Sequence, residues 1–103
     1  MKYKDFLQYL ESNLDGYQAF IQKARRYQSD KNAKRAPKSR WTEEKMEKAA
    51  YDMWKASMEP LYNKLKHEIK SDLRESWISF IAKNDIFEIV NEGINDLDFN
   101  EVA

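Results

Sequence analysis

The residues best suited to bind a ligand are eight cations gathered in one short stretch. They are Lys23, Arg25, Arg26, Lys31, Lys34, Arg35, Lys38 and Arg40. Asp30 is the only acid among residues 22–40, and Tyr27 and Trp41 add aromatic rings. Lysine and arginine neutralise phosphates, and aromatic rings stack on unpaired bases. The cations and Trp41 therefore predict a surface that contacts nucleic acid or an acidic partner.

The charge in the rest of the chain supports an alternative interpretation. Six acids and no bases occupy residues 84–103: Asp85, Glu88, Glu92, Asp96, Asp98 and Glu101. Overall the chain is neutral, with a pI near 6.6, whereas domains that bind nucleic acid are usually basic. The alternative interpretation is that the basic stretch is a solvated linker, balanced by the acidic end of the same molecule.

Catalytic chemistry has little support in the sequence. His67 is the only histidine, and Ser71 stands where a zinc-peptidase helix would place its second histidine. There is no cysteine, and two isolated glycines cannot form a phosphate-binding loop. The carboxylates occur at helix-surface spacings beside lysines. We therefore expect a protein that is not an enzyme and that uses no cofactor and no metal.

The apolar residues indicate helices throughout the chain. A stripe with alternating intervals of four and three residues opens it: Tyr3, Leu7, Leu10, Leu14, Tyr17, Ile21 and Ala24. Such a stripe is typical of a helix that buries one face. It keeps its phase across Gly16, which predicts one continuous helix over residues 3–28. Most such stripes face the core of their own bundle, and the alternative is pairing with another chain.

Polar residues and prolines divide the rest of the sequence. Residues 29–41 lack apolar periodicity and predict a basic loop. Thr42 is suited to cap the next helix, and Pro60 predicts a break or strong kink. The helices expected after the loop cover residues 42–58, 60–82 and 85–97. Residues 98–103 predict a frayed acidic tail.

We expect these elements to form a single all-α domain over residues 1–103, a three- or four-helix antiparallel bundle. Its core should join two apolar sets: Leu7, Leu10, Leu14, Tyr17 and Ile21 from the first helix, and Trp54, Leu61, Leu65, Ile69, Leu73, Trp77 and Ile81 from the later ones. The alternative is a long helical hairpin with a kinked second helix over 42–82. That hairpin would bury little surface alone and would dimerise.

These features favour a small regulatory or protein-interaction module whose amphipathic helices bind another protein. The alternative is a nucleic-acid-binding accessory factor that uses residues 23–40. A homodimer is compatible with either. The longest apolar runs fall far short of the roughly 20 residues of a membrane span, so no membrane contact is expected. The lack of cysteine favours a cytoplasmic location.

Overall fold

The computed structural model describes residues 1–99, and this part of the chain contains helices and no strands. The helices are α1 (Tyr3–Asn13), α2 (Gly16–Ala33), the short 3-10 helix η1 (Pro37–Ser39), α3 (Glu43–Ile69), α4 (Arg74–Lys83) and α5 (Ile86–Asn95). The predicted all-α class is confirmed. The described residues form five α-helices, however, instead of the three or four expected.

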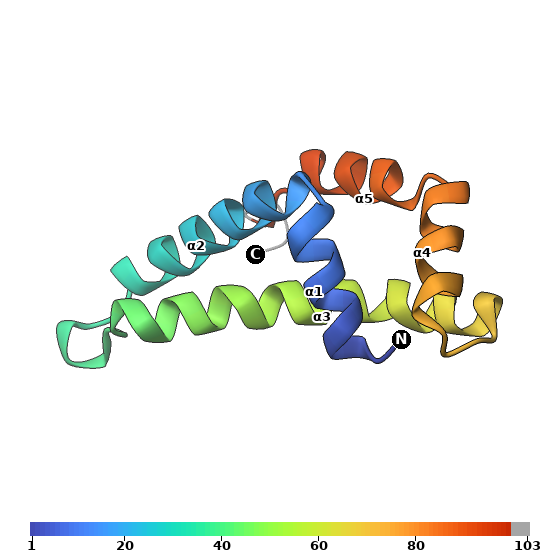
Figure 1. Cartoon of the computed structure of the whole chain (residues 1–103). Helices are drawn as coiled ribbons and strands as arrows, with labels where there is room; N and C mark the ends of the chain where they lie inside the picture. The colour runs from blue at the N-terminus through green and yellow to red at the C-terminus, as the bar shows by residue number, and fades with distance from the viewer. Residues whose placement is uncertain (100–103) are drawn as a thin grey trace.

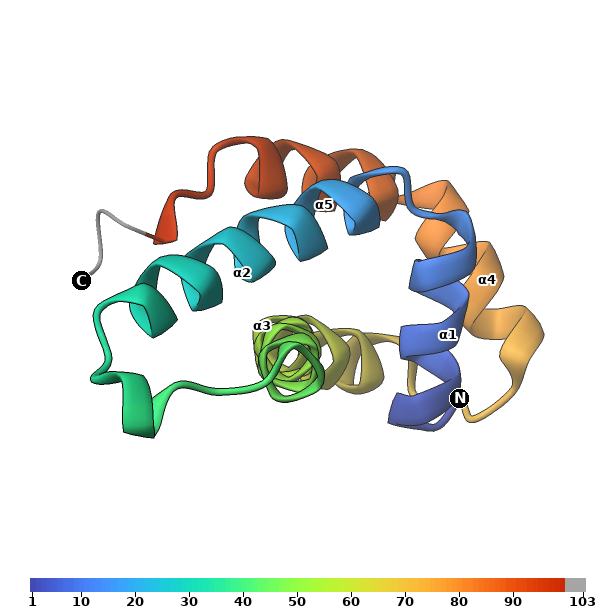
Figure 2. The ribbon, with the colours of Figure 1, turned by 90° about the vertical axis from the view of Figure 1, so that its left-hand side faces the viewer.

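The long helix α3 is the axis of the fold (Figure 1). Helix α2 runs antiparallel beside it, so the expected antiparallel arrangement holds for this pair. Helix α1 crosses α3 steeply, and α5 packs on α2 and α4. Viewed along α3, the other helices form an arc around one side of it (Figure 2). Because the α2–α3 hairpin projects beyond the rest, the molecule is elongated, at 49 × 24 × 21 Å.

Aromatic side chains dominate the core. Trp54 of α3 is wholly buried, and its ring lies 4.9 Å from that of Tyr17 and 5.2 Å from that of Phe20. A second cluster joins Phe6, Tyr62 and Trp77. Every residue of the predicted core except Leu73 belongs to the observed core or packs against it.

The predicted continuous helix over 3–28 is wrong. The chain turns at Leu14 and Asp15, so α1 ends at Asn13 and α2 begins at Gly16. Most of the stripe residues on both sides of the turn are nevertheless buried, and Tyr3 and Tyr17 are half-buried, because both helices face the same core. Gly16 is needed at this corner because the backbone approaches α5 closely there. Its amide donates to Asn91 Oδ1 of α5 at 2.8 Å. A β-carbon there would lie 2.3 Å from that oxygen.

Of the break or strong kink predicted at Pro60, the break is absent, because α3 continues through Pro60 to Ile69. Pro60 cannot donate to Ala56, but both residues are exposed and water can reach the Ala56 carbonyl. The helix ends instead at Lys70, in the left-handed conformation with φ 54°. Leu73, expected in the core, lies in the following turn and is 69% exposed.

The basic loop predicted over 29–41 is shorter than expected, because α2 extends to Ala33. The remaining loop is held by Asn32. Its side-chain oxygen accepts from the Trp41 amide at 2.8 Å, and its side-chain nitrogen donates to the Trp41 carbonyl at 3.2 Å. Thr42 then caps α3 as predicted, by accepting from the Lys45 amide. Of the predicted frayed tail over 98–103, residues 100–103 lie outside the described residues.

None of the helices within residues 1–99 combines the length and apolar character needed to span a bilayer.

The two glycines provide a matched test of this packing. Gly16→Ala should lower the free energy of unfolding by about 1 kcal/mol, because the added methyl group displaces the Asn91 oxygen and breaks its hydrogen bond. Gly93→Ala should raise it by about 0.5–1 kcal/mol, since nothing lies within 4 Å of a β-carbon there. Urea unfolding measures both. Equal stability of wild type and Gly16→Ala would contradict the corner geometry.

Candidate functional site

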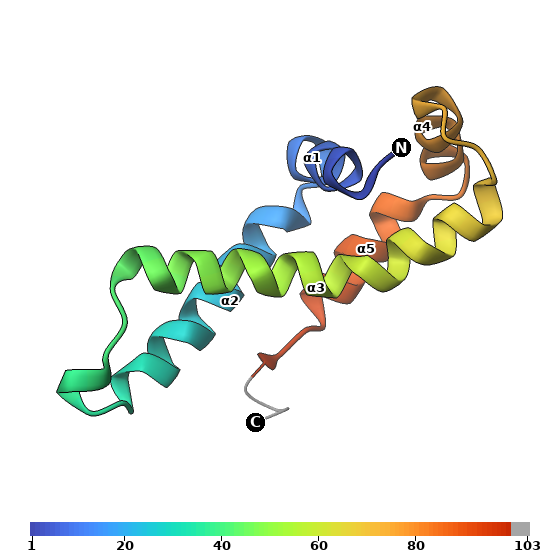
Figure 3. The same cartoon turned by 90° about the horizontal axis from the view of Figure 1, so that it is seen from below.

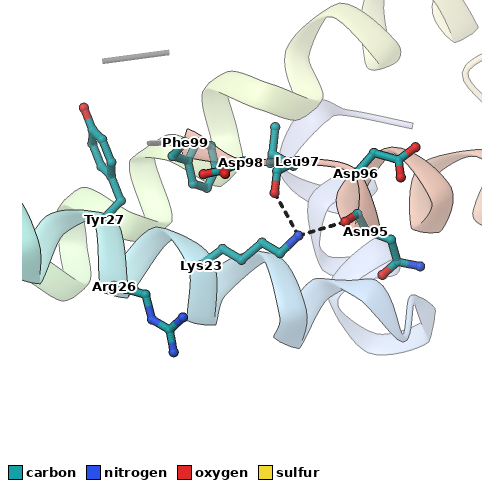
Figure 4. A pocket seen from close by; sticks show the side chains of 8 residues that line it. All are labelled: Lys23, Arg26, Tyr27, Asn95, Asp96, Leu97, Asp98 and Phe99. Atoms are coloured by element: carbon teal, nitrogen blue, oxygen red, sulfur yellow. Dashed lines mark hydrogen bonds between the residues drawn. The ribbon is translucent and has the colours of Figure 1, made fainter. Parts of the chain in front are cut away.

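Lys23, the first of the predicted contact residues, is used inside the molecule. Its Nζ donates to the carbonyl oxygens of Asn95 at 3.2 Å and Leu97 at 2.9 Å (Figure 4), and to that of Ile94 at 2.7 Å. These carbonyls lie at the C-terminal end of α5, where a cation satisfies the unpaired acceptors and the negative end of the helix dipole. Lys23 therefore anchors α5 to α2.

Two further cations and the predicted aromatic residue are also engaged within the chain. Arg25 forms an ion pair with Glu47 of α3, with Nε 2.8 Å from a carboxylate oxygen. The guanidinium of Arg35 lies 3.9 Å from the centre of the Trp41 ring and donates to Asn32. Lys45 lies over the same ring at 4.7 Å. Arg35 and Lys45 of the same chain already lie over this ring, so Trp41 is poorly placed to stack on a base.

The other predicted contact residues remain exposed: Arg26, Lys31, Lys34, Lys38 and Arg40. The last four lie at the projecting end of the α2–α3 hairpin (Figures 1 and 2). We call Lys31, Lys34, Lys38 and Arg40 the hairpin-end cations. Arg26 lies further back on α2 and borders the polar hollow of about 510 Å³ beside Lys23. Four of the nine predicted residues thus make internal contacts, four lie at the exposed end of the hairpin, and Arg26 belongs to neither group.

A carboxylate with several tyrosines around it lies between α1 and α3. Glu11 accepts a hydrogen bond from the Tyr51 hydroxyl at 2.8 Å and from Trp54 Nε1 at 3.2 Å. Tyr3 donates to the backbone carbonyl of Lys55 nearby. Burial raises the pKa of both Tyr3 and Tyr51 to about 12, with Glu59 adding to the rise at Tyr3 and Glu11 at Tyr51. These hydroxyls stay protonated at neutral pH, and their hydrogen bonds join α1 to α3.

The only histidine does not join this cluster. His67 is exposed in the last turn of α3, at the negative end of the helix dipole. Within residues 1–99, no three His, Asp or Glu side chains come together in a group that could hold a metal ion.

An apolar groove between α3 and α5 is the feature that sequence reasoning missed. It has a volume of about 270 Å³. Buried side chains from three helices form its floor: Phe20, Met58 and Ile94. Ser57 and Leu61 line it on α3, and Val90, Gly93 and Leu97 line it from the α5 side. The two helices cross in the view from below (Figure 3).

The side chains that line the groove carry no charge. On α3, Ser57 and Leu61 lie one turn apart on the same side of the helix. On α5, Glu92 and Asp96 flank Gly93 in the sequence but do not line the groove, and Ile89 is 59% exposed. The acids were visible in the sequence. The groove was not, because its lining comes from three separate segments; the signal available was Gly93 inside an otherwise strongly apolar helix.

Comparison of the chain with protein-family models, curated proteins and solved structures finds no match.

The tyrosines between α1 and α3 predict a loss of stability in alkali. Their pKa values of about 12 in the folded state exceed the ordinary value of 10. The contribution of these protonated tyrosines to the free energy of unfolding is therefore complete below about pH 10 and is lost as the pH rises towards 12. Tyr51→Phe should make this loss smaller. Urea unfolding at about pH 9 and about pH 11, with tyrosinate absorbance as a direct titration, checks this. An identical pH dependence in wild type and Tyr51→Phe would contradict it.

Proposed function

We propose that this chain is a non-enzymatic protein-interaction module that binds another protein through the groove between α3 and α5. The supporting observation is the groove itself, an open apolar surface in a chain in which 35% of residues are charged. Exposed apolar patches rimmed by polar residues are typical of interaction sites. A cytoplasmic setting, expected from the sequence, is part of this proposal.

Gly93 adds support from the energetics of α5. A glycine in a helix interior costs about 1 kcal/mol relative to alanine. At Gly16 a close contact within the described chain explains this cost, but at Gly93 no atom lies within 4 Å of a β-carbon. The missing side chain keeps the groove open on the α5 side. Its absence would allow the backbone of a bound segment to approach closely.

The test is to fill the groove without disturbing the fold. Gly93→Leu should be tolerated, because the position is open and leucine favours a helix. Proteins captured from the native host by the wild type should be lost with Gly93→Leu and kept with Ala82→Leu, a change of the same kind on the exposed surface of α4. Identical recovery with all three proteins would contradict the proposal.

Nucleic-acid contact through the hairpin-end cations is the second candidate. The observation in its favour is that Lys31, Lys34, Lys38 and Arg40 stay exposed, without ion pairs in the described part of the chain, at the projecting end of the hairpin. Neutralising phosphates with such cations gives binding that weakens steeply with salt. The engaged ring of Trp41 weighs against base stacking and favours contact with the phosphate backbone.

A salt series with labelled DNA and RNA tests this candidate. Binding at low salt should fall at least about tenfold when the four hairpin-end cations become alanine, with a shallower salt dependence. Arg35 is left unchanged because it helps to order the loop. Lys48→Ala and Lys55→Ala, two exposed lysines of α3, serve as the control. No binding at low salt, or binding unaffected by the alanines, rules the candidate out.

A further inference from the structure

We propose that residues 96–99 form a strap that partly covers the apolar floor of the groove, and that Lys23 holds this strap closed. Release of the strap extends the groove across Phe20 towards α2. The inference rests on the proposed function, because it describes how the same groove is opened and closed.

The ring of Phe20 belongs both to the groove and to the surface under the strap. It forms part of the groove floor and is only 1% exposed. Phe99 of the strap contributes to this burial, because the two rings lie 5.5 Å apart at an angle of 85°, an edge-to-face contact. The ring of Phe99 also lies 5.8 Å from that of Tyr27. Phe99 therefore covers apolar surface of α2 that adjoins the groove.

The strap also supplies part of the groove wall. Leu97 lines the groove together with Val90 and Ile94 of α5, and it is half-buried. Since α5 ends at Asn95, Leu97 lies beyond the helix and its position also depends on contacts outside it. Movement of the strap would therefore displace a wall residue and uncover Phe20 at the same time.

Lys23 is the polar side chain that ties the strap to α2. Its Nζ donates to the carbonyl oxygens of Asn95 and Leu97, where the chain leaves α5 (Figure 4). Hydrogen bonds from a charged donor are stronger than those between neutral groups. Keeping each strap residue in one conformation costs backbone entropy, and the half-buried ring of Phe99 offsets only part of that cost. The closed strap thus depends on the ammonium group of Lys23.

Helix α5 has attachments of its own that do not involve the strap. Ile94 is 3% exposed and Ile86 is 9% exposed, so both side chains belong to the core. Asn91 accepts a hydrogen bond from the Gly16 amide at the start of α2. The strap can therefore open while α5 stays in place, as a local opening of a chain segment.

The test removes the ammonium group of Lys23 in the full chain. Lys23→Met keeps an apolar stem but cannot donate to the carbonyl oxygens. Lys64→Met, a change of the same kind at an exposed lysine of α3, is the control. In NMR spectra, the nuclear Overhauser contact between the rings of Phe20 and Phe99 should be present in the wild type and in Lys64→Met. It should be lost in Lys23→Met.

Amide hydrogen exchange separates release of the strap from detachment of the helix. The Leu97 amide donates to the Ile94 carbonyl, and in Lys23→Met it should exchange at least about tenfold faster, because the charged hydrogen bonds that hold this segment are gone. The Gly16 amide should keep the exchange rate of the wild type, since Asn91 still accepts from it.

Binding of Nile red, an uncharged apolar dye, measures the extent of the groove. Its fluorescence should rise several-fold with Lys23→Met. It should rise likewise with Phe99→Ala, which uncovers Phe20 but leaves the hydrogen bonds of Lys23 in place. Adding Gly93→Leu to either variant should reduce the rise, because leucine fills the groove beside the uncovered ring. Lys64→Met should bind the dye as the wild type does.

Each result separates this inference from the proposed function. A contact between Phe20 and Phe99 that persists in Lys23→Met, or a Gly16 amide that exchanges faster there, overturns the strap held by Lys23. Unchanged dye binding by Phe99→Ala, or a rise that Gly93→Leu does not reduce, overturns its connection with the groove. Capture from the host that still depends on Gly93 keeps the proposed function in all these cases. Unchanged capture by Gly93→Leu removes the proposed function, and with it the role of the strap in partner binding.

Discussion

The fold depends on the burial of Trp54 at the middle of α3. Its indole ring packs against Tyr17 and Phe20 of α2, and its Nε1 donates to Glu11 of α1. One side chain thus joins the first three α-helices, with its polar atom satisfied by a carboxylate that also holds Tyr51. Since a buried donor without a partner costs about 1–3 kcal/mol, the position of α1 across α3 is tied to this hydrogen bond. Helix α5 then packs on α2, and the groove lies between α5 and α3.

The sequence predicted which residues are buried better than it predicted where helices end. The stripe from Tyr3 to Ala24 identified its core residues but not the turn at Leu14, because a turn between two helices that face the same core leaves the apolar order intact. At the turn Gly16 contacts Asn91, which lies 75 residues away in the chain, and a local pattern cannot show such a contact. The break predicted at Pro60 is absent for a related reason. Proline is costly where the freed carbonyl is buried, and a linear pattern does not show that Ala56 faces water.

The same limit applies to the candidate site. The sequence placed the cations in one group, but the partners of Lys23 are backbone carbonyls near the other end of the chain, and Arg25 pairs with a residue of the next helix. Only the tertiary structure separates the engaged cations from the exposed ones. The groove was beyond sequence reasoning because Phe20, Leu61 and Val90 belong to three stripes that each look like ordinary core. The acids of residues 84–99 stood out in the sequence, but none of them lines the groove.

The attachment of α5 has a consequence for how the groove could change in evolution. Asn91 holds the middle of α5 against the start of α2, and Lys23 holds its end. The position of the α5 wall of the groove is therefore set by α2. Substitutions at residues such as Gly16 or Lys23, which do not line the groove, would shift that wall and alter its width. The shape of the groove is thus controlled in part by positions that lie outside it.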